Sequence, residues 1–315
     1  MHTPDFQSPA AALPAAPASL AAPNLAPPAS PTPAAAGEPG MWAQVMRAKP
    51  AKPGEIYGVP GQGDSLMISA IVISGLIFLW WLVTQMGWIK PLFLPSPAAV
   101  IDSFTTLLRD GFTGTSFWEH TWISTARVFG AFLLACLIGI PLGIAMGMSP
   151  VARGIFDPPI EFYRPIPPLA YLPLMIIWFG IDETSKVLLI FLSVFAPVAL
   201  GARAGVKSAA IEQIHAAYSF GATRWQVIRM VILPSAMPEI LTAMRIGIGF
   251  GWTTLVAAEM VASTAGLGYM VLSASKFLQT ATVIMGIVVI AAIAYAFDHL
   301  MRWVERKVVP WKGRA

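Results

Sequence analysis

Six long apolar runs divide the sequence, and charged residues are nearly absent from them. Each run is close to the roughly 17 to 25 residues that a helix needs to cross the hydrocarbon layer of a membrane. Backbone N–H and C=O groups in that layer must be satisfied within the segment, so we expect helices. Thr121 is expected to open the second helical stretch, and the two shortest runs to extend past their charge-free limits. The runs are Leu66 to Val83, Val128 to Met148, Pro165 to Ile181, Val187 to Ala202, Leu241 to Ala262 and Thr280 to Phe297.

The long connection at 203–240 carries its own helical pattern. Apolar residues recur there at spacings of three or four, which indicates one face of a helix. Gly221 interrupts the pattern, and Thr223 with Gln226 fits a capping box. In a capping box the Thr hydroxyl accepts from the backbone N–H of the Gln, and the Gln side chain accepts from the backbone N–H of the Thr. We therefore expect two short helices, the first ending near Gly221 and the second starting near Thr223. Pro234 is expected to stop the second helix, with Pro238 in the first turn of the next one.

Two interpretations of this connection remain open from its pattern alone. An amphipathic pair lying on the membrane surface would expose mostly Lys and Arg on its polar face. A docking element would instead present small neutral residues, which let a foreign groove approach the backbone closely. The turn has that second character, with Ala216, Ala217, Ser219, Gly221 and Ala222.

The composition supports a membrane protein and excludes other classes. Of the 315 residues, 56% are hydrophobic and 11% are charged, against about 25% charged in a soluble domain. A disordered chain would be poor in apolar and aromatic residues. Residues 1–60 are the exception, because their high proline and alanine content predicts a disordered arm ahead of a membrane domain at 61–312. The single cysteine, Cys136, rules out a disulfide framework, and basic residues lack the clustering of a nucleic-acid binder.

The basic residues are distributed unequally between the two sides. If the N-terminus is cytoplasmic, 15 of the 20 Lys and Arg residues fall on the cytoplasmic side and five on the other. The rule that cytoplasmic loops carry the excess of Lys and Arg then places both termini in the cytoplasm. The five residues on the other side are Lys90, Arg109, Arg127, Lys186 and Lys276. The cytoplasmic set includes Arg153 and Arg164, in a loop expected at 149–164.

The same connection carries a recognisable motif. His215-Ala216-Ala217, then Gly221-Ala222, then Val231-Ile232-Leu233-Pro234 resembles the "EAA" motif of ABC importer permeases, with His215 at the position of the usual Glu. Further segments resemble the nitrate/sulfonate/taurine branch, and in detail its taurine-transporting members. The resemblance covers roughly residues 65–312 and rests on segments 153–161, 163–174, 178–186, 195–198, 204–208 and 255–259.

The resemblance implies an all-α integral membrane fold with about six transmembrane helices, of the type I ABC importer kind, with cytoplasmic coupling helices at about 208–234. Such permeases pair in a bacterial inner membrane, bind two cytoplasmic ABC ATPase subunits and receive substrate from a periplasmic binding protein. ATP and Mg would bind the partner ATPase, and the permease itself would hold no cofactor. The implied cargo is taurine or a related sulfonate, with nitrate, bicarbonate or another small solute as alternatives. The resemblance places ATPase coupling at His215, Ala216, Ala217, Tyr218, Gly221, Ala222, Thr223, Trp225, Leu233 and Pro234.

A few polar residues inside the apolar runs are candidates for the translocation path. Trp252, Thr253 and Thr254 lie in the middle of the fifth run. Arg245 and Glu259 lie near its ends, and ionisable residues within membrane helices are functional candidates by default. We expect Arg245 to reach toward the cytoplasmic interface and Glu259 to lie near the outer side, either in structural pairing or in a gate.

Other patterns favour packing rather than chemistry. Gly139, Gly143 and Gly147 form two overlapping G-x-x-x-G units, and the glycines at 247, 249 and 251 alternate, as expected where helices pack closely. The proline-rich stretch at 165–173 predicts a bent or delayed helix start, with a hinge as the alternative. The four histidines are scattered and no catalytic set is visible, so we expect neither a metal site nor an enzyme. A stand-alone secondary transporter is the alternative from another class, but buried charges and inverted repeats are missing from the pattern.

Overall fold

The computed structural model describes residues 66–311. The chain divides into two units, 1–72 and 73–315, and of the first unit only the beginning of α2 is described. The arm predicted at 1–60 lies outside the described residues. Within the described range the secondary structure is helical apart from an isolated bridge between Phe112 and Thr115. The elements are α2 (Leu66–Gln85), α3 (Pro97–Asp110), α4 (Phe117–Met148), α5 (Pro150–Tyr163), α6 (Pro168–Phe179), α7 (Glu183–Val206), α8 (Ile211–Ser219), α9 (Arg224–Val227), the π-helix η1 (Ile228–Ile232), α10 (Leu233–Ala262), α11 (Leu267–Lys276) and α12 (Thr280–Val308).

Five helical stretches are long and apolar enough to cross a membrane, and each contains one predicted run. They are α2, α4, α7, the continuous stretch from α9 through α10, and α12. The expected extension of the fourth run is confirmed, because α7 reaches from Glu183 to Val206. The second helix starts earlier than predicted. Ser116 accepts a hydrogen bond from the backbone N–H of Glu119 and so caps α4 ahead of Phe117, rather than at Thr121.

Helices α4 and α7 pack closely and run in the same direction. A Cβ added to Gly139 would lie 3.3 Å from Val198, one at Gly143 2.6 Å from the Cβ of Ala202, and one at Gly147 2.5 Å from Val206. The residue numbers of the contacting positions therefore increase along both helices at once, which means that the helices are parallel. The prediction that this glycine series serves helix packing is confirmed.

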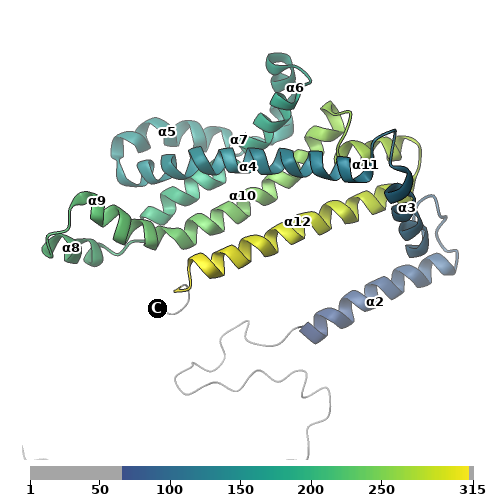
Figure 1. Cartoon of the computed structure of the whole chain (residues 1–315), viewed down its shortest axis with the longest axis horizontal. Helices are drawn as coiled ribbons and strands as arrows, with labels where there is room; N and C mark the ends of the chain where they lie inside the picture. Colours follow the sequence, from purple (N-terminus) through teal and green to yellow (C-terminus); the bar gives the residue numbers. More distant parts are fainter. Residues whose placement is uncertain (1–65, 312–315) are drawn as a thin grey trace, which may run out of the picture. The chain divides into compact units, whose positions relative to one another are not determined.

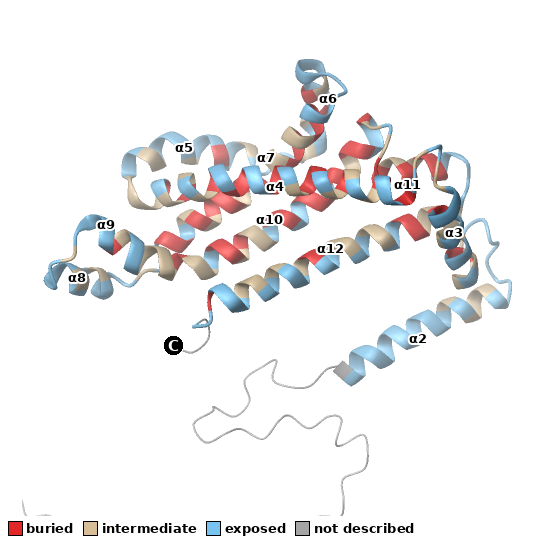
Figure 2. Cartoon of the chain, viewed as in Figure 1, coloured by how far each residue is buried: buried red, intermediate tan, exposed pale blue. Residues whose placement is uncertain are grey.

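Helix α10 runs antiparallel to α7. Gly205 of α7 faces Ala236 near the start of α10, whereas Gly247 and Gly251 lie against Val194. Gly249 has no atom within 4 Å of an added Cβ, so packing explains only two of the three alternating glycines. Figure 2 shows the buried residues concentrated where α4, α7 and α10 meet, whereas α8 has no buried residue.

The predicted run at 165–181 corresponds to a shorter helix than expected. Helix α6 has 12 residues, about 18 Å at 1.5 Å per residue, which is less than the roughly 30 Å of a membrane core. Its start is delayed by prolines, as predicted. The segment 149–164, expected to be a cytoplasmic loop, is instead the 14-residue helix α5, which begins after a Ser149 cap.

Together α5 and α6 provide the return crossing that the fold requires. Since α4 and α7 run in the same direction, the chain between them must travel back along the bundle. Helix α5 starts directly after the end of α4, and α6, set at an angle to α5, leads to the start of α7 (Figure 1). Residues 164–167 interrupt this crossing, so the third membrane passage is a broken helix rather than a continuous one (Figure 1).

Candidate functional site

The helical turn between α7 and α10 has the local structure that the sequence predicts. Helix α8 ends at Ser219, and Gly221 adopts a φ of +81°, a conformation that side chains with a Cβ adopt rarely. Thr223 caps α9, because its backbone N–H donates to Gln226 Oε1 at 2.7 Å and its Oγ1 accepts from the Gln226 N–H at 3.4 Å. The predicted capping box is confirmed.

The same element is almost entirely exposed. No side chain of α8 is buried. Phe220 at the tip is 91% exposed and Trp225 of α9 is 69% exposed, while Tyr218 is also exposed. Aromatic rings held out from a capped turn leave a large apolar area without a partner in the described chain, which is typical of an interaction surface.

Phe220 is the residue of this surface that the sequence did not reveal. It lies off the helical repeat of apolar positions, between two small residues, and was therefore not assigned a role. Its exposure follows from the end of α8 one residue earlier. An aromatic residue next to a glycine that ends a helix is the signal that could have identified it.

The prediction that Pro234 stops the second helix is wrong. The chain continues from α9 through η1 into α10, and Pro234 lies in the first turn of α10. The N–H of Leu233 bonds to the Ile228 carbonyl, five residues back, so the π-turn absorbs the register change before the proline. Pro238 lies inside α10 rather than in its first turn. Leu233 and Pro234 are therefore half-buried parts of the long helix.

Helix α9 is connected mechanically to the bundle. A largely apolar cavity of about 350 Å³ separates Trp225 and η1 from the last turns of α4 and α7. Val227, on the same turn, is buried. The turn at α8–α9 is therefore joined to α10 by continuous helix. The lining residues are Pro141, Ile144, Ala145, Met148, Val206, Trp225, Ile228, Ile232, Leu233 and Ala236.

Removing the cap is expected to loosen this turn. Thr223→Ala deletes the acceptor for the Gln226 N–H, and loss of such a cap costs about 1 kcal/mol. We expect faster amide hydrogen exchange over 224–232 in the purified protein. Thr105→Ala, whose exposed hydroxyl bonds only within α3, is the control and leaves that segment unchanged. Equal exchange in the wild type and Thr223→Ala would show that the cap does not hold the turn.

A second cluster lies at the opposite end of the bundle, around Glu259. Arg127 of α4 donates from Nη1 to Glu259 Oε1 at 2.7 Å and makes two 2.6 Å bonds to the Glu183 carboxylate. Lys186 donates to the same carboxylate at 2.8 Å. The Glu259 side chain is fully buried and Arg127 nearly so. Two cations and two anions balance, so the cluster is neutral.

Hydrogen bonds from the turn before α11 complete this cluster. The Gly268 N–H donates to Glu259 Oε2 at 2.8 Å, and Ser124 bonds to the same carboxylate at 2.7 Å. The Gly266 N–H donates to Nδ1 of buried His120 at 3.0 Å, and the Leu267 N–H to Ser124 at 2.8 Å. Both oxygens of Glu259 are therefore engaged. This geometry favours the structural pairing of Glu259 over a gate.

The sequence did not reveal the partners of Glu259. Arg127 and Lys186 were placed among the charges of outer connections, whereas both lie in helices and are buried. Arg127 could have been recognised as a cation ten residues inside the helix that begins at Phe117. Arg245, expected to reach toward the cytoplasmic interface, pairs with Glu305 near the end of α12 at 3.1 Å.

The residues predicted for the translocation path face different ways. Trp252 and Thr254 are buried inside the chain, and Trp252 packs against Phe297. Thr253 is exposed, with its hydroxyl donating to the Gly249 carbonyl at 2.9 Å. Among the described residues no group of three or more His, Cys, Asp or Glu is placed to hold a metal ion.

Comparison with known proteins places this fold in a family. A model of the binding-protein-dependent transport system inner membrane component matches residues 139–310. The chain belongs to this family. It is an ABC importer permease and a multi-pass inner-membrane protein.

Relatives within and beyond the family agree with this assignment. The taurine transport system permease protein TauC of Escherichia coli K12 is 53% identical over 78% of this chain and 90% of its own length. The putative aliphatic sulfonates transport permease protein SsuC of Bacillus subtilis 168 is 33% identical over 89% and 97%. An inward-facing structure of the MetNI methionine ABC transporter, 18% identical, has a TM-score of 0.53 and covers 61% of this chain and 96% of its own. The last comparison shows a common fold.

Proposed function

We propose that this permease forms the membrane path of an ATP-driven importer for taurine or a related sulfonate. The observation that carries the proposal is the exposed, capped turn at α8–α9, which stands at one end of an apolar bundle and continues into α10. The chain's similarity to a taurine permease supports the cargo.

The proposal assigns the exposed turn to a cytoplasmic ATPase. Two ATPase subunits, which bind ATP and Mg, would engage two permease copies through His215 to Trp225, with Phe220 added to the predicted set. Closure of the ATPases would move α9 and, through η1, α10. Both termini would then be cytoplasmic, and a periplasmic binding protein would deliver cargo at the end that carries the Glu259 cluster. Of the four residues predicted for the path, Thr253 is the one whose exposure supports that role.

Reconstituted transport tests the proposal directly. Proteoliposomes containing the permease, supplied with the partner binding protein, should take up taurine only when the ATPase and ATP are also present. Uptake by the permease alone would identify a secondary transporter instead. Determining which compound the binding protein retains would separate taurine from nitrate or bicarbonate.

A charge at the tip should disrupt docking without disturbing the bundle. Gly221→Asp is expected to reduce co-purification with the ATPase at least several-fold, because an added side chain points into open space where a partner would approach. Gly114→Asp is a matched control, because Gly114 has nearly the same φ of +80° and equally open space, but lies before α4 at the other end of the bundle. Unchanged co-purification of Gly221→Asp would contradict the docking assignment.

A further inference from the structure

The interruption between α5 and α6 lies level with the middle of the bundle. Tyr163, the last residue of α5, lies with its hydroxyl 3.4 Å from the Leu192 carbonyl, near the midpoint of α7. The cavity beside the interruption is also lined by Ile246 and Phe250, in the middle of α10. The broken backbone therefore lies beside the middle of α7 and α10 rather than at an end of the bundle.

Non-helical backbone within a membrane needs partners for its polar N–H and C=O groups. Proline at 165, 167 and 168 removes three N–H donors and prevents a continuous helix. Non-helical backbone is tolerated within a membrane only where it is buried in protein or lines a water-filled cavity. Arg164 to Pro167 are exposed and line a cavity of about 530 Å³, so the second condition applies. This volume is within the range of small-molecule sites.

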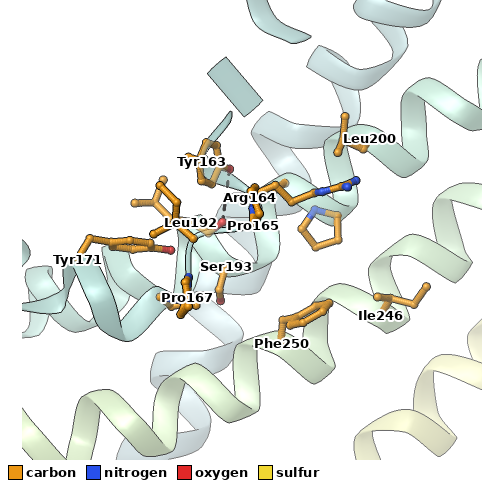
Figure 3. Close-up of a pocket in the computed structure, with 14 residues that line it drawn as sticks. Tyr163, Arg164, Pro165, Pro167, Tyr171, Leu192, Ser193, Leu200, Ile246 and Phe250 are labelled. Atoms are coloured by element: carbon orange, nitrogen blue, oxygen red, sulfur yellow. Dashed lines mark hydrogen bonds between the residues drawn. The ribbon is translucent and has the colours of Figure 1, made fainter. Parts of the chain in front are cut away.

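Arg164 is the charged residue of this cavity. Four other arginines of the bundle, at 127, 203, 245 and 302, each pair with a carboxylate. For Arg164, no described acidic side chain is in salt-bridge range, and its guanidinium extends along the cavity wall toward Leu200 (Figure 3). A cation inside a membrane protein marks an ion or substrate pathway by default, and a guanidinium binds oxyanions through paired N–H donors.

The opposite parts of the cavity offer aromatic faces. Tyr171 projects from α6 and Phe250 from α10, with the Arg164 segment between them (Figure 3). Aromatic faces attract cations such as an ammonium group. A cavity with one guanidinium and several ring faces therefore matches a small zwitterion that carries an oxyanion at one end and an amine at the other.

We propose that the cavity at the α5–α6 interruption is a binding site for the transported amino sulfonate, with the sulfonate on Arg164 and the ammonium against the ring of Phe250. This inference rests on the proposed function. It adds a site inside the membrane domain, in the chain segment that the sequence assigned to a cytoplasmic loop.

Substitution of Arg164 tests the binding site in the full transporter. Arg164→Gln should lower ATP-dependent taurine uptake by about tenfold or more, because a charge-assisted hydrogen bond is lost, whereas Arg164→Lys should retain part of the uptake. ATP hydrolysis stimulated by the loaded binding protein should persist in both. Arg153→Gln, in the preceding helix α5 but outside the cavity, is the matched control and should transport like the wild type.

Each outcome has a distinct meaning. If Arg164→Gln takes up taurine at the wild-type rate, the proposal that Arg164 binds the sulfonate is wrong. Loss of uptake together with loss of stimulated ATP hydrolysis would also overturn it, since that result indicates a defect in coupling. Absence of taurine uptake by the wild-type complex would refute the proposed function, which is a separate failure.

The class of ligand is tested by comparing the binding of two sulfonates. Ethanesulfonate lacks the amine, so Phe250→Leu should weaken the binding of labelled taurine to the permease–ATPase complex while leaving that of ethanesulfonate nearly unchanged. Equal weakening of both compounds would overturn the assignment of the Phe250 ring to the ammonium.

Discussion

Glu259→Ala is expected to destabilise the permease more than any other single substitution in its ionic clusters. The carboxylate accepts bonds from Arg127, Ser124 and the Gly268 N–H, all in a buried setting. Removing one partner of a buried pair costs about 3 to 5 kcal/mol, and here two cations would share the Glu183 carboxylate while the buried donors of Ser124 and Gly268 lose their acceptor. At roughly 2 to 4 °C per kcal/mol for a domain of this size, the melting temperature should fall by about 6 to 20 °C.

Tryptophan fluorescence of detergent-solubilised protein during heating measures this effect. Arg302→Ala serves as the comparison, because the Arg302–Asp298 pair is largely exposed and such pairs contribute about 0 to 1 kcal/mol. Equal melting temperatures for the two variants would show that the Glu259 cluster does not hold the bundle. If Glu259→Ala is as stable as the wild type but no longer transports, the result would instead support a role for Glu259 in gating.

Gly143→Ala is expected to separate α4 from α7. The added Cβ would lie 2.6 Å from the Cβ of Ala202 and 3.1 Å from the Ala199 carbonyl carbon, and neither backbone nor Cβ can rotate away. Overpacking of this kind typically costs about 1 to 3 kcal/mol. The same substitution at Gly130, in the same helix, meets no atom within 4 Å and should be neutral or slightly stabilising.

Thermal melting and the fraction of monodisperse protein in size-exclusion chromatography provide the measurement. Because Gly130→Ala makes the same chemical change, it controls for the intrinsic helix propensity of alanine. If the melting temperature of Gly143→Ala equals or exceeds that of Gly130→Ala, then α4 and α7 are not in contact at that position.

The membrane crossings and the exposed turn could be predicted because both depend on local information. The length of an apolar run decides whether a helix can span, and α4, α7, α10 and α12 coincide with such runs. The turn at Gly221 and Thr223 is decided by residues within three positions of each other, since a positive φ requires glycine and a capping box requires Thr and Gln at fixed spacing. The prediction that Pro234 ends a helix failed because a π-turn can accommodate the missing N–H.

The long-range pairs could not be predicted in this way. Arg127 and Glu259 are 132 residues apart, and their contact depends on the rotation and register of two helices about each other. The same rotation decides that Gly247 faces α7 while Gly249, two residues away, meets nothing.

The sequence by itself therefore determined where five membrane-spanning helices lie, where the exposed turn lies and to which family the chain is similar. Only the tertiary structure decided that α5 and α6 form one broken crossing, and that Arg164 lies beside a cavity rather than in a loop. The physical reason is the parallel packing of α4 and α7, because this contact between distant segments obliges the chain between them to return through the bundle.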